Sequence, residues 1–191
     1  MVAAKQGLGK RLRALRRERA LTLTGLAKLT RRSVSLLSQI ETGKVSPSFS
    51  SMRIIAEALG VPLSRLILDS EPDETRESAL MSARGRKVLT TQGSVQHQLL
   101  SRNLALPFEF LRVEIPPHSS TGDELYTHEG VECGLLLQGE LEVHVGRRIY
   151  RMKPGDTITL NSTIPHRIFN RGKRTARAVW VNSVPMIFST R

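Results

Sequence analysis

The spacing of apolar residues changes once along this 191-residue chain, and the change limits what each part can fold into. Up to about residue 68, apolar side chains recur at intervals of three and four, the period of an amphipathic helix. From Val88 onward they alternate with polar side chains, the period of a half-buried strand. The intervening stretch sustains neither pattern. We therefore predict a helical domain over 1–68, a linker over 69–87 and a β domain over 88–191.

Capping residues divide the first domain into five short helices. Thr22 and Ser33 are suited to cap the second and third helices, because their hydroxyls can accept from unpaired backbone amides. Gly43 follows the third helix at a position that often needs a left-handed backbone. Ser48 precedes the fourth helix, and Gly60 ends it. Frequent Gly, Pro and Asp turns between short alternating stretches predict a β-sandwich or barrel for the second domain.

Positive charge is concentrated in the first domain. The chain carries a net charge of +12 at a sequence pI of about 11.0. Residues 1–68 contain 13 Lys and Arg but three Glu, which leaves +10 of that charge in the first third. Such an asymmetry indicates a polyanion-binding domain joined to a near-neutral one. A merely solvated basic surface is the alternative interpretation of charge alone.

Composition also limits the setting in which the protein works. Cys133 is the only cysteine, so no internal disulfide can form, and we expect a reducing, cytoplasmic location. No apolar run approaches the roughly 18 residues of a membrane span, and no apolar segment follows the basic N-terminus as in a signal peptide. We therefore expect no membrane partner.

The stretch from Ser33 to Lys44 carries a specific motif. With Ser46-Pro47-Ser48 and the Ala-Leu-Gly-Val of 58–61, it resembles the phage-repressor and Cro type of helix-turn-helix, the XRE family, over about residues 8–68. The resemblance implies a five-helix, lambda-repressor-like domain whose third helix enters the major groove of duplex DNA. A helical bundle that binds protein instead is the alternative.

The resemblance also assigns DNA contacts. Val34, Ser35 and Gln39 are the candidates for base edges, and Gln39 can pair with adenine through two hydrogen bonds. Arg31 and Arg32 replace the usual glycine and apolar residue of the turn, which predicts some backbone strain and further phosphate contacts. The complete set of expected DNA-binding residues is Thr22, Arg31, Arg32, Ser33, Val34, Ser35, Ser38, Gln39, Thr42 and Lys44. We expect Glu41 to pair within the domain.

A second motif lies in the β domain. Residues 126–132, Gly139, Pro154-Gly155-Asp156 and Pro165-His166 resemble a cupin, a double-stranded β-helix or jelly-roll barrel, over about 93–185. In that family two histidines, a glutamate and a later histidine bind a divalent metal inside the barrel. This chain has His128, Glu132 and His166 at three of the four positions but a tyrosine at the first. The resemblance implies a cofactor such as Zn, Ni, Fe or Mn, and hydrogen bonding to an organic ligand is the alternative.

A small-molecule site is expected in the same barrel. Glu124 and Glu132 can pair with a cationic amine, whereas Arg112 favours an anion. The expected ligand-binding residues are Arg112, Glu124, Tyr126, His128, Glu132 and His166. We interpret His97 as a surface or loop residue and Trp180 as part of the barrel core or of a dimer interface.

The combination of both motifs resembles bacterial regulators of the putrescine-utilisation repressor subgroup. This implies a homodimeric, non-enzymatic transcription repressor that binds a pseudo-palindromic DNA site. A small metabolite in the barrel, such as an amine or amino acid, would control its DNA affinity. Two alternatives stay open: a metal-dependent cupin enzyme fused to a DNA-binding domain, and a nucleoid or antitoxin protein whose cupin only dimerises.

Overall fold

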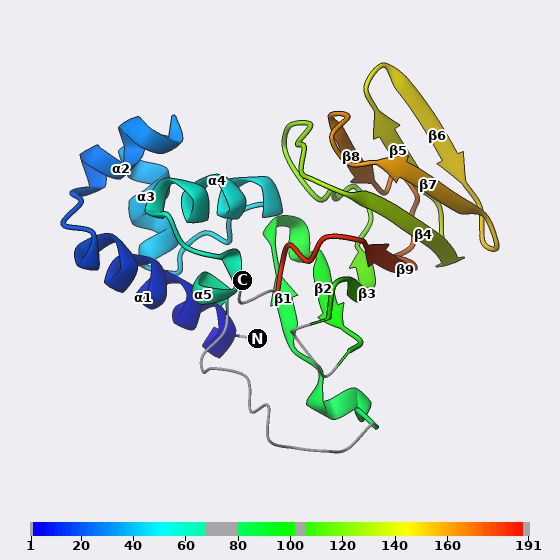
Figure 1. Cartoon of the computed structure of the whole chain (residues 1–191), viewed down its shortest axis with the longest axis horizontal. Coiled ribbons are helices and arrows are strands. Elements are labelled where there is room, and N and C mark those ends of the chain that lie inside the picture. The colour runs from blue at the N-terminus through cyan, green and yellow to red at the C-terminus, as the bar shows by residue number, and fades with distance from the viewer. Residues whose placement is uncertain (1, 68–79, 102–105, 189–191) are drawn as a thin grey trace.

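A helical domain and a β domain lie side by side in the computed structural model (Figure 1). The structure describes residues 2–67, 80–101 and 106–188, with side chains from Gly7 onward. The helical part of the described chain consists of α1 (Val2–Glu18), α2 (Leu23–Thr30), α3 (Val34–Glu41), α4 (Phe49–Leu59) and α5 (Leu63–Ile67). The predicted five-helix domain is confirmed. None of the described helices is long and apolar enough to cross a membrane.

The helix ends follow the capping residues. The Thr22 hydroxyl accepts from the amide of Gly25 at 2.9 Å, and the Ser33 hydroxyl accepts from that of Leu36 at 3.1 Å. Ser48 caps α4 in the same way, through the amide of Ser51 at 3.3 Å. These bonds satisfy amides that the first turn of a helix leaves without partners. The positions at which these helices begin could therefore be predicted from their capping residues.

Two antiparallel sheets form the β domain. Among the described residues, the larger sheet has the order β1-β2-β3-β9-β4-β7 and the smaller one the order β6-β5-β8. Two single-turn 3-10 helices, η1 (Ala83–Gly85) and η2 (Gln92–Ser94), flank β1. The strands are β1 (Val88–Thr90), β2 (Gln96–Leu99), β3 (Glu109–Ile115), β4 (Val131–Gln138), β5 (Leu141–Val145), β6 (Arg148–Met152), β7 (Thr157–Asn161), β8 (His166–Phe169) and β9 (Ala176–Asn182). This arrangement confirms the expected cupin barrel.

Alternation along the strands sends one side chain in two into the barrel. In β4, Glu132, Gly134 and Leu136 are buried while the residues between them are exposed. Gly134 is required there, because a Cβ at this position would lie 2.1 Å from the Trp180 ring. The barrel core therefore contains a buried carboxylate next to the only tryptophan of the chain.

The two domains meet at the beginning of α4. The amide of Gln92 donates to the carbonyl of Pro47 at 3.0 Å, and Phe49 is 1% exposed. The predicted linker falls mostly on residues 68–79, which lie outside the described residues, so the domain boundaries stay predictions.

Candidate DNA-binding surface and ligand site

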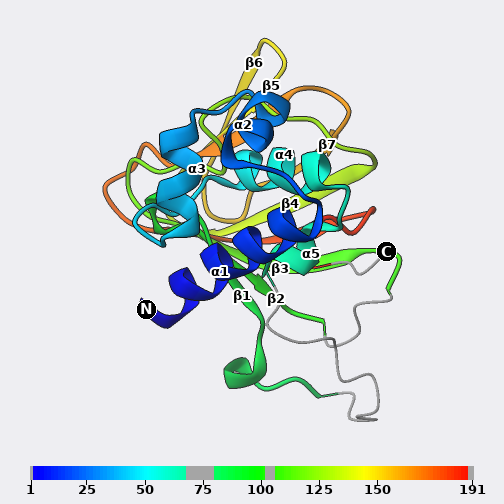
Figure 2. The ribbon, with the colours of Figure 1, turned by 90° about the vertical axis from the view of Figure 1, so that its left-hand side faces the viewer.

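The helix α3 presents one apolar and one polar face. Leu37 and Ile40 are buried against the other helices, whereas Ser35 and Gln39 are exposed. Viewed from the side of the helical domain, α1, α2 and α3 lie in front of the strands, so the barrel does not cover α3 (Figure 2). The polar face of α3 is therefore accessible to a large partner such as a DNA duplex.

Four other predicted DNA-binding residues lie at the ends of α2 and α3 or just beyond them. Thr22 and Ser33 use their hydroxyls as helix caps, so they are positioned by the fold itself. Thr42 donates its hydroxyl to the carbonyl of Ser38 at 2.9 Å, and Lys44 is exposed. Three of these residues therefore use their hydroxyls to hold the ends of α2 and α3.

The two arginines of the turn differ in their surroundings. Arg31 ends α2 in the left-handed conformation, with φ 52° and ψ 36°, and its side chain is exposed. The expected backbone strain is therefore present. Arg32 is turned toward the barrel, where its Nη1 lies 3.9 Å from the Glu124 carboxylate. Arg31 is consequently the freer of the two for a phosphate contact.

A buried ion pair fixes α3 against α1. The Arg16 Nε donates to Glu41 Oε1 at 2.6 Å, and its Nη2 donates to Oε2 at 3.0 Å. A third donor of the guanidinium binds the carbonyl of Leu21 at 2.7 Å. The Glu41 carboxylate raises the pKa of Arg16 further above its ordinary value. The predicted intradomain role of Glu41 is confirmed.

Three of the predicted ligand-site residues converge inside the barrel. Ligand atoms of His128, Glu132 and His166 all lie within 4.8 Å of one another. The Nε2 of His166 is 3.1 Å from Glu132 Oε1, and the Nε2 of His128 contacts the same oxygen. Main-chain carbonyls orient both rings, because His128 Nδ1 lies 2.9 Å from the oxygen of Glu129 and His166 Nδ1 lies 2.8 Å from that of Ile164.

The Glu132 carboxylate remains ionised in this buried place. Burial alone would raise its pKa, but hydrogen bonds and charge from His128 and His166 outweigh that effect and lower the pKa to about 2. The indole of Trp180 donates to the second carboxylate oxygen at 2.5 Å. The site is therefore a negative charge held among aromatic and imidazole rings.

Tyr126 occupies the position of the missing first histidine. Its ring packs at 4.7 Å from the His166 ring and at 6.3 Å from the His128 ring. The hydroxyl donates to Thr121 Oγ1 at 3.0 Å. Burial and the Glu132 charge raise the pKa of Tyr126, so its phenol stays neutral. Tyr126 is thus a wall of the site and a hydrogen-bonding group, not an anionic ligand.

Two predicted ligand residues lie away from this centre. Arg112 alternates with Leu111 and Val113, which line the cavity, and its Nη2 pairs with Glu114 Oε1 at 2.5 Å. Glu124 lies in a loop, and its side chain is 74% exposed. Strand alternation explains the outward position of Arg112, since moving one residue along a strand reverses the face on which the side chain lies.

The site contains residues that the sequence did not single out. A small cavity of about 20 Å³ adjoins Glu132 and Trp180, and it is also lined by Phe49 of α4 and by His97. The interpretation of His97 as a surface residue is wrong, because β2 buries it to 5% exposure. His97 lies on the same face of β2 as the apolar Leu99. This spacing is the one feature of the sequence that indicates the burial of His97. Trp180 is confirmed as a core residue.

The His–Glu–His group satisfies the chemistry of a metal site in part. Two imidazoles and a carboxylate suit a divalent transition metal, and the Nε2 atoms of both histidines already point at one oxygen of Glu132. Against this, Trp180 already uses one carboxylate oxygen. These three residues would therefore hold a metal through one oxygen and two nitrogens.

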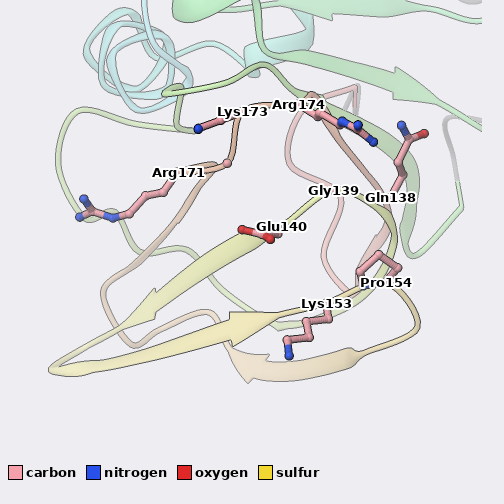
Figure 3. A pocket seen from close by; sticks show the side chains of 9 residues that line it. Gln138, Gly139, Glu140, Lys153, Pro154, Arg171, Lys173 and Arg174 are labelled. Carbon is pink, nitrogen blue, oxygen red and sulfur yellow. The ribbon is translucent and has the colours of Figure 1, made fainter.

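A larger hollow lies at another place on the barrel surface. Turns between strands enclose about 810 Å³, and Figure 3 shows basic side chains around it with Glu140 at the centre. Arg171 belongs to this hollow, but its Nε donates to Glu142 at 2.7 Å. The hollow shares no lining residue with the cavity beside Glu132. It is therefore separate from the candidate ligand site.

Comparison with known proteins supports both halves of this description. Residues 8–66 match the family described as helix-turn-helix domain, and residues 111–182 match that described as cupin domain. The HTH-type transcriptional regulator PuuR of Escherichia coli (strain K12) is 28% identical over 176 residues, covering 90% of this chain and 91% of PuuR. The regulator SutR of the same strain is 24% identical, covering 88% of this chain and 89% of SutR.

A solved structure shares the fold over almost the whole chain. A transcriptional regulator of the HTH_3 family from Vibrio cholerae superposes with a TM-score of 0.64 at 20% identity, covering 96% of this chain and 98% of the other. Both named relatives are described as HTH-type transcriptional regulators, in agreement with the regulator expected from the sequence. The chain therefore has a helix-turn-helix domain followed by a cupin domain, and it is homologous to the HTH-type transcriptional regulator PuuR.

Proposed function

We propose that this protein is a homodimeric repressor that binds a pseudo-palindromic DNA site through α3 and releases it in response to a small cationic metabolite. The observation that carries the proposal is the pairing of two surfaces in one chain. An exposed polar helix face lies in a domain with most of the net charge, and an ionised carboxylate lies inside the barrel. One suits a polyanion, and the other suits a cation.

The DNA-binding part is tested by selecting a duplex from a random pool with the full chain. We expect a site with two half-sites about one helical turn apart. Replacing Gln39 by Ala should relax preference at one base pair per half-site, by about 1–3 kcal/mol, because a paired side-chain contact to a base is lost. Glu57→Ala is the control, since Glu57 is exposed on α4 and is not among the expected DNA-binding residues. A Gln39 variant with unchanged preference at every position would contradict the assignment of α3.

The metabolite is proposed to be an amine because the site offers one buried anion. Glu132 keeps its charge, and the flanking rings of Tyr126 and Trp180 provide faces that attract cations. Melting temperatures of the full chain with polyamines, amino acids and anionic phosphonates test this. A concentration-dependent rise with amines alone is expected, since a ligand of the folded state stabilises it. A rise with phosphonates alone would reverse the proposed charge preference.

The same group would bind a divalent cation, and the proposal names Zn, Ni, Fe or Mn as candidates. His128, Glu132 and His166 would provide the ligands and orient the metal toward the barrel interior. Metal analysis of the purified chain before and after chelation separates the two kinds of cation. Amine stabilisation that survives chelation assigns the carboxylate to the amine, and stabilisation lost with the metal assigns it to both.

The dimer is proposed to form on the outer face of the larger sheet. Val131, Leu135 and Leu137 of β4 are 37–52% exposed there, and Phe110 of β3 is 36% exposed. Strand register places Leu135 beside Val179 of β9, which makes a continuous apolar patch. Leu135→Glu should convert the dimer to a monomer in light scattering, whereas Ile149→Glu on the smaller sheet should not. An unchanged mass for the Leu135 variant would place the interface elsewhere.

A further inference from the structure

A residue of the helical domain forms part of the barrel interior. Phe49, the first residue of α4, is 1% exposed although it stands at the end of a helix. Its ring lies 5.5 Å from the His97 ring and 5.6 Å from the Tyr126 ring, and both rings belong to the barrel domain. Figure 1 shows α4 on the side of the helical domain that faces the strands, with α2 on the far side. Phe49 therefore closes the barrel from outside.

The space left beside Phe49 is too small for a metabolite. The cavity it lines with Glu132 and Trp180 has a volume of about 20 Å³, which is room for about one water molecule. By comparison, a buried apolar cavity of roughly 150 Å³ can bind benzene. A ligand that reaches Glu132 through this cavity must therefore displace a side chain that lines it, and among the lining residues Phe49 is the one that the helical domain contributes.

An unpaired polar group lies against the same ring. Both nitrogens of His97 are buried without a hydrogen-bond partner in the described part of the chain. Leaving buried polar atoms unpaired is unfavourable, and such atoms are rare in folded proteins. Phe49 offers His97 only an apolar ring, so a ligand with a polar atom at this position would form a bond that Phe49 cannot.

The remaining contact between the domains is small. Among the described elements, no helix makes an extensive contact with a strand. Polar links between the described parts of the two domains include the Gln92–Pro47 hydrogen bond and the 3.9 Å approach of Arg32 to the mostly exposed Glu124. A small interface of this kind favours relative motion of domains.

We propose that the Phe49 ring occupies a ligand subsite of the barrel, lined by His97, Tyr126 and Glu132, and that a flat apolar amine and the DNA-binding domain compete for it. The DNA-related half of this inference rests on the proposed function. With Phe49 in place, each helical domain is held at a fixed position on its barrel, which sets the separation of the two α3 helices in the dimer. A ligand that displaces Phe49 frees the domain and weakens binding to two spaced half-sites.

The subsite is tested with benzylamine, which combines a phenyl ring with an ammonium group. The full-length Phe49→Ala protein should bind benzylamine at least tenfold more tightly than the parent chain. Fluorescence of Trp180, the only tryptophan, should change on binding because its indole lines the cavity. Ile55→Val is the control, since Ile55 is buried in α4 but does not line the cavity. Equal affinities for the parent and the Phe49 variant would overturn the subsite.

The competition between the ligand and the DNA-binding domain is tested with a disulfide. The disulfide holds the two domains together when the Phe49 ring has been removed. A Cβ at position 122 would lie 3.0 Å from Ser50 Oγ, a separation that suits a Ser50→Cys/Gly122→Cys crosslink in a Cys133→Ser background. Phe49→Ala should weaken binding to the selected duplex at least fivefold. Adding the two cysteines and oxidising them should restore the affinity, and reduction should abolish the gain.

The outcomes separate this inference from the proposed function. If the oxidised and reduced forms bind the duplex equally, docking does not control DNA affinity and the competition is overturned. If the parent chain selects no duplex, the proposed function fails, yet benzylamine binding still decides whether Phe49 fills a ligand subsite. Should Phe49→Ala fail to fold, the crosslinked chain with Phe49 present provides the same comparison: its reduced form should bind benzylamine at least tenfold more tightly than its oxidised form, and equal affinities would overturn the subsite.

Discussion

The helical domain and the barrel each contain a buried carboxylate, and the two are neutralised in different ways. Glu41 faces the guanidinium of Arg16, whose charge is permanent, and both oxygens are used. Glu132 faces two imidazoles and an indole, none of which carries a permanent charge. This difference indicates that the surroundings of Glu41 are the more rigid of the two. A fixed ion pair positions α3, whereas a titratable cluster leaves the barrel open to exchange partners for a ligand.

The largest expected effect comes from breaking the rigid pair. Glu41→Gln should lower the free energy of unfolding of the helical domain by about 3 kcal/mol, because the Arg16 charge stays buried without its anion. Urea unfolding followed by helical circular dichroism measures this. The paired change Arg16→Met/Glu41→Leu should recover most of the loss, since no charge is left buried. A loss well under 1 kcal/mol would mean that the pair behaves as an exposed one.

The barrel should be sensitive to acid through its buried histidine His97. Burial lowers the pKa of His97 from 6.5 to about 4, so the unfolded chain binds this proton first as the pH falls. Its contribution to stability is therefore present above pH 6.5 and is lost as the pH falls toward 4, by roughly 3 kcal/mol. Unfolding followed by Trp180 fluorescence across this range measures the loss.

A control and a second pH window sharpen this prediction. His97→Leu should remove the dependence between pH 6.5 and 4, because the variant has no imidazole to protonate. The pKa of Glu132 is lowered to about 2, so its contribution is present above pH 4.5 and is lost as the pH falls from 4.5 to 2. The loss of stability between pH 4.5 and 2 should persist in the His97→Leu variant. A parent curve that is flat from pH 6.5 to 4 would mean that His97 finds a partner in solution.

The same comparison explains how much could be predicted from the sequence. In the helical domain the signals are local: Thr22, Ser33 and Ser48 cap helices within three residues of the amides they bind. The positions of the helices and of the exposed face of α3 were therefore predictable. In the barrel, Tyr126, His128, Glu132 and His166 were found because they form a family motif.

The residues that were missed come from remote segments with weak patterns. His97 lies in Gln96–Leu99, where only one of four residues is apolar, so alternation does not reveal its buried face. No sequence pattern indicates that Phe49, the first residue of α4, reaches another domain. The outward direction of Arg112 depends on strand register, which side-chain pairing across the sheet sets and the sequence alone does not.

The smallest expected effect tests backbone strain at the turn before α3. Arg31 has φ 52°, a left-handed conformation that glycine adopts without strain. Arg31→Gly should therefore raise the free energy of unfolding by about 0.5–1 kcal/mol, measured by the same urea titration. Arg31→Ala is the control, because it keeps the Cβ and removes only the guanidinium. If Arg31 binds phosphate, both variants should weaken DNA binding equally while only the glycine variant is stabilised. A glycine variant no more stable than the alanine variant would show that the turn is not strained. Weaker DNA binding by the glycine variant alone would instead assign Arg31 a role in holding the turn rigid and not in binding phosphate.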